Sequence, residues 1–221
     1  MAPAPQPRPA DRPQRLGPTL AVCALWLLLA GAAVARLTGG LEAWTYEAQR
    51  RQLAAQGGLH ASPLPLRDAQ GRTWTAFEPA SAPRPVYLVD FIYTRCPTVC
   101  QALGSEYYRM QQALQASGRP VGLLSVSIDP QHDDQAALAA YAELHQAAPG
   151  HWRVAAPRSD AAAQAALREL GVVAVPDGLG GFVHNGSIHL IDANGRVHGV
   201  FDYAQWPEAL ARAERLAGGA R

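Results

Sequence analysis

The sequence of 221 residues contains only three cysteines and no lysine, and its charges nearly balance. Three cysteines are too few for a small domain held together by disulfides, because such domains need several pairs. Nineteen basic residues, all of them arginine, and 18 acidic residues give a formal net charge of +1. A charge so close to zero creates no strong surface field, so no nucleic-acid partner is expected.

The patterns that mark several large enzyme classes are also missing. The sequence contains no glycine-rich phosphate loop, no paired carboxylates that suggest acid–base catalysis, and no Ser–His–Asp order that indicates a hydrolase. It contains no internal repeat either. The length is enough for one domain with its own hydrophobic core and additional segments.

One long apolar run, residues 16–35, contains no charged residue. Twenty residues in a helix span about 30 Å, the thickness of a bilayer core. Three arginines in residues 1–15 favour a cytoplasmic N-terminal tail and an exported remainder. Ala33-Val34-Ala35 also fits the cleavage site of a signal peptide. We prefer an uncleaved membrane anchor because the run is long for a signal peptide; both alternatives place the remainder outside the cytoplasm.

After a polar tether at residues 36–58, the pattern predicts one domain over residues 59–221. Two short extended pieces flank a turn at residues 68–72, and a glycine-rich loop covers residues 171–186. We expect strands at residues 86–93, 121–128, 152–154, 187–192 and 196–201, and helices at residues 98–117, 134–147, 159–170 and from Trp206 onward. This alternation predicts an α/β fold with a thioredoxin-like central sheet flanked by helices, preceded by an N-terminal transmembrane helix.

Cys96 and Cys100 lie where the first buried strand passes into a helix. A spacing of four residues places both thiols on one helical face. Backbone N–H groups at the helix start and the charge of Arg95 are expected to lower the pKa of at least one thiol. The pair can close a disulfide or hold a soft metal ion such as Cu(I) or zinc. Two sulfurs are too few for copper or zinc, so a histidine must come from elsewhere in the chain.

Three ordered blocks, at residues 90–100, 125–133 and 184–192, together resemble the SCO/SenC family of copper chaperones. Residues 90–100, DFIYTRCPTVC, resemble the family's F-x-x-T-x-C-P-x-x-C signature. Residues 125–133, SVSIDPQHD, resemble its S-V-D-P-x-x-D segment, and residues 184–192, HNGSIHLID, resemble a block in which a metal-binding histidine precedes an L-I-D hairpin. The resemblance covers roughly residues 60–216. Gln101 and Val183 depart from it, since the family has Pro and Asp at these positions.

The resemblance implies that Cys96, Cys100 and His184 bind copper, as Cu(I) or Cu(II). It implies a periplasmic or intermembrane-space protein. Together with the apolar run, this leads us to expect a single-pass protein of the bacterial inner membrane with its C-terminal domain in the periplasm. The implied role is assembly of the binuclear copper centre of cytochrome c oxidase, by delivering copper or by preparing the recipient cysteines. The implied partners are the copper-centre subunit, an upstream copper donor or a thiol reductase, and the membrane through the N-terminal helix.

Two enzyme alternatives remain open beside this metallochaperone. A thiol–disulfide oxidoreductase would use Cys96 and Cys100 as a catalytic redox dithiol without delivering metal, and a peroxidase-like relative would need an activated cysteine pocket. His184 separates the first alternative from the chaperone, because a reductase does not need this histidine.

Four further polar residues have roles that their positions in the sequence suggest. His189 and His198 are predicted to form a cross-strand pair at the surface. Asp129 and Asp133 either orient the site or have purely structural roles, Asp129 in a turn with Pro130 and Asp133 as the cap of the next helix.

Overall fold

The computed structural model describes residues 16–40, 44–80, 84–96, 99–178 and 180–219, and it divides the chain into two compact units. The first unit is Met1–Gln49 and the second is Arg50–Arg221. The predicted cytoplasmic tail, residues 1–15, lies outside the described residues, and so do Pro97 and Thr98.

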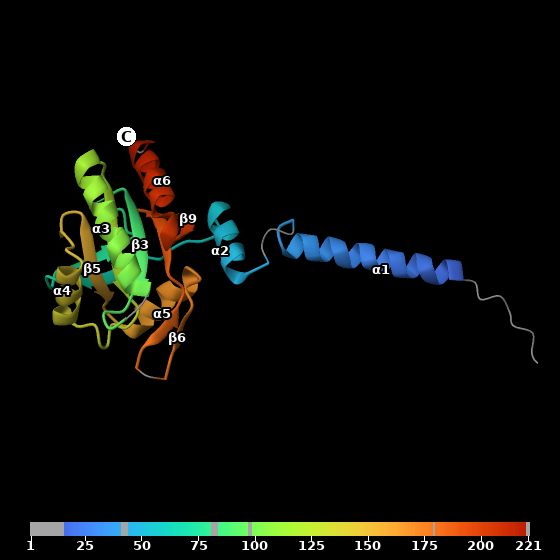
Figure 1. Cartoon of the computed structure of the whole chain (residues 1–221), viewed down its shortest axis with the longest axis horizontal. Helices are drawn as coiled ribbons and strands as arrows, with labels where there is room; N and C mark the ends of the chain where they lie inside the picture. Colours follow the sequence, from blue (N-terminus) through green and yellow to red (C-terminus); the bar gives the residue numbers. More distant parts are fainter. Residues whose placement is uncertain (1–15, 41–43, 81–83, 97–98, 179, 220–221) are drawn as a thin grey trace, which may run out of the picture. The chain divides into compact units, whose positions relative to one another are not determined.

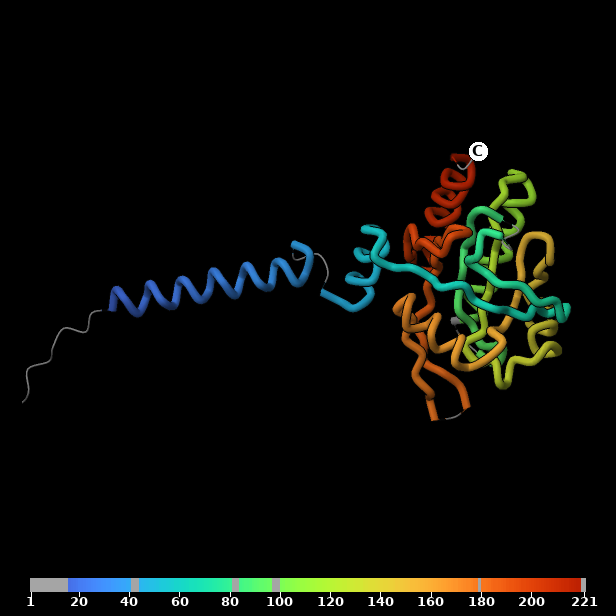
Figure 2. The backbone as a smooth tube through the Cα atoms, turned by 180° about the vertical axis from the view of Figure 1, so that it is seen from behind, coloured from blue at the N-terminus to red at the C-terminus, as the bar shows by residue number. Residues whose placement is uncertain are grey.

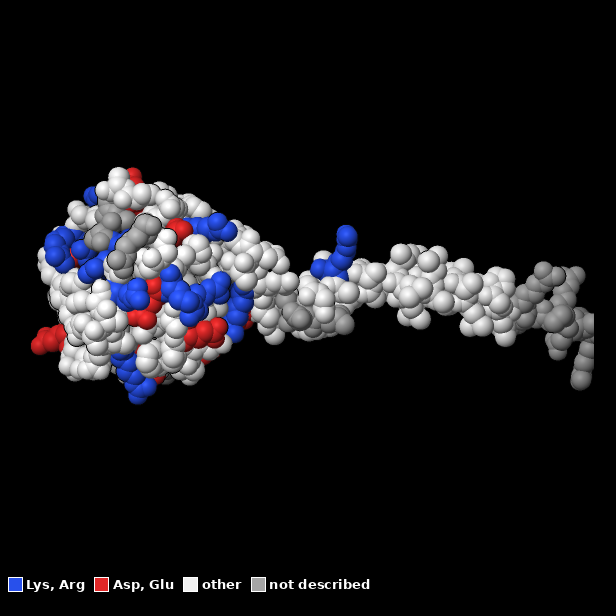
Figure 3. All heavy atoms as spheres, turned by 90° about the horizontal axis from the view of Figure 1, so that it is seen from above, with Lys and Arg blue, Asp and Glu red and all other residues white. Residues whose placement is uncertain are grey.

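In the first unit, the predicted apolar run forms helix α1, Leu16–Leu37. The helix is long and apolar enough to cross a membrane, although a signal sequence near an N-terminus meets the same criteria. Figure 3 shows that the surface of this helix is almost entirely uncharged. Its one charged residue is Arg36, in the last turn. Length and composition therefore support a span, and the choice between anchor and signal peptide remains a prediction.

The second unit is built on a seven-stranded sheet with the order β2-β1-β5-β4-β3-β8-β9. Strands β3, β4 and β5 run parallel, whereas β8 pairs antiparallel with β3 and β9, and β1 pairs antiparallel with β5 and β2. All seven residues of β3 are buried, as expected for a central strand covered on both faces. The strands are β1 Leu64–Asp68, β2 Thr73–Ala76, β3 Val86–Ile92, β4 Val121–Ser127, β5 Trp152–Pro157, β8 Ser187–Asp192 and β9 Val197–Asp202.

The four predicted helices pack against this sheet in the expected order, and one further helix, at residues 46–55, lies within the predicted tether (Figure 1). Helix α3 packs on β4 and α6, α6 also packs on β3, and both α4 and α5 pack on β5 and β1. The helices are α2 Tyr46–Ala55, α3 Val99–Ser117, α4 Gln135–Leu144, α5 Asp160–Glu169 and α6 Trp206–Gly219, and a short 3₁₀ helix η1 covers Tyr203–Gln205. The predicted central sheet flanked by helices is confirmed.

Helix ends follow local capping chemistry. Ser159 caps α5 by accepting a hydrogen bond from the Ala162 N–H at 3.2 Å, as predicted. Helix α4 is capped by Asp134, whose side chain accepts from the Ala137 N–H at 2.8 Å, so the alternative that Asp133 is the cap is wrong. The α4 helix ends at Leu144, three residues before the predicted end, and Gln146 then adopts a left-handed φ of 55°.

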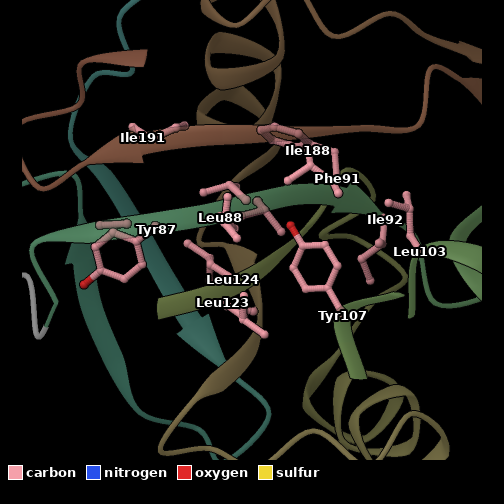
Figure 4. Packing of buried hydrophobic residues seen from close by; sticks show 14 of the residues in the cluster. Tyr87, Leu88, Phe91, Ile92, Leu103, Tyr107, Leu123, Leu124, Ile188 and Ile191 are labelled. Atoms are coloured by element: carbon pink, nitrogen blue, oxygen red, sulfur yellow. The ribbon is translucent and has the colours of Figure 1, made fainter. Parts of the chain in front are cut away.

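The core lies between β3, β4 and the apolar stripe of α3. Leu103, Tyr107, Met110 and Leu114 recur at helical spacing and are fully buried. Figure 4 shows Leu103 and Tyr107 beside the side chains of the central strands. This stripe is therefore core, as predicted, and it fixes the position of the helix whose first turn carries Cys100.

Helix α3 approaches the end of α4 closely at Gly104. The His145 ring fills the space where a Cβ at Gly104 would stand, and it lies 4.5 Å, centroid to centroid, from the Tyr141 ring. We expect Gly104→Ala to reduce the free energy of unfolding by about 1–3 kcal/mol through overpacking, although alanine favours helix. Chemical denaturation measures this, with the exposed neighbour Ser105→Ala as the control, expected within about 0.5 kcal/mol of wild type. A neutral Gly104→Ala would contradict the tight packing.

Candidate metal centre

The two cysteines lie at the passage from β3 into α3. The Cys96 backbone N–H donates to the Tyr93 carbonyl at 3.1 Å, which closes a turn directly after the strand. Cys100 lies in the first turn of α3, and its N–H donates to the Cys96 Sγ at 3.4 Å. Both cysteines are present as thiols rather than as a disulfide, and both are buried. A helix-start N–H therefore points at a sulfur, as the sequence predicts.

His184 reaches the cysteines from a distant part of the chain. Its Nε2 lies 3.3 Å from the Cys100 Sγ. The possible ligand atoms of Cys96, Cys100 and His184 all lie within 4.8 Å of one another. The structure thus brings together the three residues that the resemblance named, and their donor set is two sulfurs and one imidazole nitrogen.

The segment that carries His184 contains two short paired strands where the sequence predicts a glycine-rich loop. Residues 174–176 (β6) pair antiparallel with residues 182–184 (β7) in a separate two-stranded sheet, with Ala174 opposite His184. Figure 2 shows this hairpin, in orange, projecting below the main sheet. We call residues 173–185 the arm. The prediction missed its strands because each has only three residues and the glycines dominate the pattern.

Asp133 fixes the turn that leads to Cys96. Its buried carboxylate accepts hydrogen bonds from the Thr94 N–H at 3.1 Å, the Thr94 hydroxyl at 2.6 Å and the Ser127 hydroxyl at 2.6 Å. The structure therefore supports the orienting role of Asp133 rather than the role of a helix cap.

Asp129 binds the side chains of Arg95 and His132 beside the turn. Its carboxylate accepts from Arg95 at 2.9 Å and contacts the His132 Nδ1 at 2.8 Å. The guanidinium of Arg95 is therefore paired with a carboxylate, which reduces the field it exerts on Cys96.

The pKa of the Cys100 thiol is raised, first by its interaction with the Cys96 sulfur and then by burial. The expected lowering of a thiol pKa is thus not found at Cys100. Two adjacent sulfurs cannot both ionise cheaply in a buried site, so they retain a proton between them. A metal ion must displace this proton, which makes metal affinity dependent on pH.

Asp90, the fifth of the seven residues of β3, has no role that was predicted from the sequence. Its side chain is fully buried, and neither carboxylate oxygen has a hydrogen-bond partner among the described residues. Burial raises the pKa of this carboxyl from 3.8 to about 7, while the nearby Ser125 and Tyr107 hydroxyls and the His184 imidazole offset part of the rise. The sequence signal was a single charged residue inside an otherwise apolar run.

The predicted surface pair of His189 and His198 is wrong. His189 is buried, and its ring contacts Phe91 at 5.5 Å between centroids and the Arg50 guanidinium at 3.2 Å. His198 bonds instead to Asp192 at 2.8 Å. Arg50, within the predicted tether, also donates to the Ser187 hydroxyl at 2.6 Å, so a residue far away in sequence determines the environment of His189.

The fold and the site together define a thioredoxin-like protein with a candidate metal centre of two thiols and one imidazole. The sequence profile described as SCO1/SenC matches residues 41–217. The chain therefore belongs to the SCO1/SenC family.

Individual relatives agree with this assignment. The chain is 28% identical over 114 residues to a SCO1 protein homolog of Bacillus subtilis (strain 168), in a match that covers 51% of this chain and 59% of the relative. ScoI of Bradyrhizobium japonicum with copper bound has a TM-score of 0.59 at 25% identity, over 71% of this chain and 98% of the other. BsSco, of the Sco family of cytochrome c oxidase assembly proteins, has a TM-score of 0.63 at 19% identity, over 74% of this chain and 95% of the other.

Proposed function

We propose that this protein is a copper-binding assembly factor for cytochrome c oxidase, and that Cys96, Cys100 and His184 hold the copper. The observation that carries the proposal is the convergence of their three ligand atoms within 4.8 Å. The copper-bound ScoI relative and the family's association with oxidase assembly support it.

Donor chemistry favours copper over zinc. Two thiolates suit Cu(I), and the imidazole adds the nitrogen that Cu(II) prefers. Zinc takes four ligands in structural sites, and among the described residues the cluster offers three. Copper(II) also exceeds zinc in intrinsic affinity for nitrogen and sulfur sites.

The same proposal includes the cellular arrangement. Helix α1 anchors the protein in the bacterial inner membrane, residues 36–58 link it to the domain, and the domain of residues 59–221 lies in the periplasm. The copper-centre subunit of the oxidase receives the metal, after an upstream donor has supplied copper or a reductase has prepared the thiols. Support comes from the length and composition of α1.

A thiol–disulfide oxidoreductase is the second candidate function. The hydrogen bond from the Cys100 N–H to the Cys96 Sγ favours it, since such a bond stabilises a thiolate that can attack a disulfide. In that case Cys96 and Cys100 would be catalytic, and the two electrons of the dithiol would reduce the cysteines of the recipient.

Transfer to the recipient separates the two candidates. The full chain in detergent, loaded with Cu(II), is mixed with the soluble copper-centre domain of the oxidase, and copper transfer and free thiols are both measured. We expect His184→Ala to lower the yield of copper transfer by about 10–100-fold or more, because losing a ligand costs at least as much as losing its outer-shell support. Reduction of a disulfide by His184→Ala should remain near the wild-type rate.

Each outcome decides between the functions. If wild type reduces the recipient's disulfide but transfers no copper, the reductase is the correct function. If His184→Ala transfers copper as well as wild type, His184 is not a ligand of the delivered ion. His132→Ala, near the site but outside the ligand cluster, is the control and should transfer copper normally.

A further inference from the structure

The arm that carries His184 is held in shape by hydrogen bonds between its own residues. At its base, the Val173 N–H donates to the Asn185 side chain at 3.0 Å, and the Asn185 N–H donates to the Val173 carbonyl at 3.3 Å. Near its tip, the Asp177 N–H donates to the Gly181 carbonyl at 3.0 Å. These bonds shape the arm but do not place it against the cysteines, so its position depends on contacts with the body of the domain.

Tyr93 supplies such contacts from the end of β3. Its hydroxyl donates to the Phe182 carbonyl at 3.2 Å. Its ring lies edge-on to the Phe182 ring, with centroids 5.6 Å apart, and to the His184 ring, with centroids 5.9 Å apart. The Tyr93 carbonyl also accepts the hydrogen bond from Cys96. One buried residue therefore contacts both the turn of the dithiol and the strand of the histidine.

Gly181 shows how closely the arm approaches Tyr93. A Cβ at Gly181 would lie 3.0 Å from the Tyr93 hydroxyl oxygen and 2.7 Å from the Asp177 Oδ2. The second nitrogen of His184, Nδ1, is buried and has no hydrogen-bond partner among the described residues. A metal-binding histidine is normally oriented through its second nitrogen, so here other contacts must orient the ring.

We propose that Tyr93 is a positioning residue that holds the arm beside the cysteines, a contact that we call the latch. Through this contact it sets the preference of the site for Cu(II) over Cu(I). This proposal rests on the proposed copper site. Cu(I) tolerates ligation by two sulfurs alone when the third ligand is lost, whereas Cu(II) needs the imidazole nitrogen. A looser arm therefore weakens Cu(II) binding more than Cu(I) binding, and the one-electron reduction of bound Cu(II) to Cu(I), with the electron from an external reductant, becomes more favourable.

Tyr93→Phe tests the latch because it removes the hydroxyl and keeps the ring. Losing one hydrogen bond of about 0.5–1.5 kcal/mol corresponds to a loss of Cu(II) affinity of about two- to tenfold. Cu(I) affinity should change less than about twofold, so the midpoint potential should rise by roughly 20–60 mV, at about 59 mV per tenfold change. Tyr93→Leu, which also removes both ring contacts, and Gly181→Ala, which pushes the arm away, should move the potential in the same direction, Tyr93→Leu by more.

The experiment uses the full chain in detergent, titrated with each copper oxidation state and followed by visible absorbance and redox titration. Tyr87→Phe is the matched control, since this tyrosine lies in β3, directly after which Tyr93 follows. Its hydroxyl accepts from the Arg84 N–H at 3.0 Å, outside the copper site. Its copper affinities and potential should equal those of wild type.

Unchanged Cu(II) affinity and potential in Tyr93→Phe, with wild type binding copper, would overturn the latch and leave the proposed function standing. Equal weakening of both oxidation states would also overturn it, because Tyr93 would then support the dithiol rather than the arm. If wild type itself binds no copper, the proposed function fails and the latch fails with it.

Discussion

Replacing Asp90 with asparagine is expected to make the metal-free protein more stable at pH 8, although the change lies at the centre of the main sheet. The wild-type carboxylate is buried without a hydrogen-bond partner among the described residues. Burial raises the pKa of Asp90 from 3.8 to about 7. The ionised form therefore costs the folded state roughly 4 kcal/mol, at about 1.4 kcal/mol for each pKa unit.

The sign of the pH dependence follows from proton binding. Between pH 4 and pH 7 the folded protein binds the Asp90 proton more tightly than the unfolded chain, so the free energy of unfolding falls as the pH rises through this window. Above the folded pKa both states are ionised and the full cost remains. From pH 5 to pH 8, the free energy of unfolding of wild type should fall by about 2–3 kcal/mol because of Asp90. This contribution should be absent in Asp90→Asn.

Denaturation of both proteins at several pH values, with chelator and reductant present, measures this difference. A buried amide has its own cost, so we expect a net gain of about 1–3 kcal/mol for Asp90→Asn at pH 8. The pKa of the Asp133 carboxyl is also raised by burial. Asp133 is present in both proteins, so its contribution to the pH dependence cancels in the comparison. The exposed Glu143→Gln is the control and should follow wild type. Parallel pH curves for Asp90→Asn and wild type would contradict an unpaired buried carboxylate.

Local patterns predicted most of the fold. The run of β3 is long and apolar apart from Asp90, and the stripe from Leu103 to Leu114 has helical spacing. Both patterns therefore predicted the elements and the buried faces that the structure has. The three candidate ligands were also named from sequence, although only the resemblance could join His184 to cysteines more than 80 residues away. The structure adds that they meet through β7.

Long-range contacts account for what sequence reasoning missed. His189 was predicted at the surface because it lies opposite His198 in the predicted hairpin. In the structure it is inside the protein, in contact with Arg50, which lies 139 residues earlier. The orienting role of Asp133 depends on Thr94, which precedes it by 39 residues. The contact of Tyr93 with the arm spans 89 residues and depends on the close approach at Gly181. No local pattern encodes such pairs.

The largest expected effect on function concerns the thiols. Cys96→Ala or Cys100→Ala should remove tight copper binding, because a single remaining thiolate cannot clamp the ion against His184. The loss should exceed the roughly 10–100-fold that removal of an outer-shell partner costs. Cys23→Ala provides a matched control, since this third cysteine is exposed on α1 and should leave copper binding unchanged.

Copper titration of the reduced full chain, followed by visible absorbance after oxidation to Cu(II), tests the central claim most directly. We expect one copper per chain and an intense sulfur-to-copper charge-transfer band in wild type and Cys23→Ala, and neither in Cys96→Ala or Cys100→Ala. His184→Ala should keep Cu(I) and lose most of its Cu(II) affinity. Wild-type affinity and an unchanged band in either thiol variant would contradict a copper centre at Cys96, Cys100 and His184.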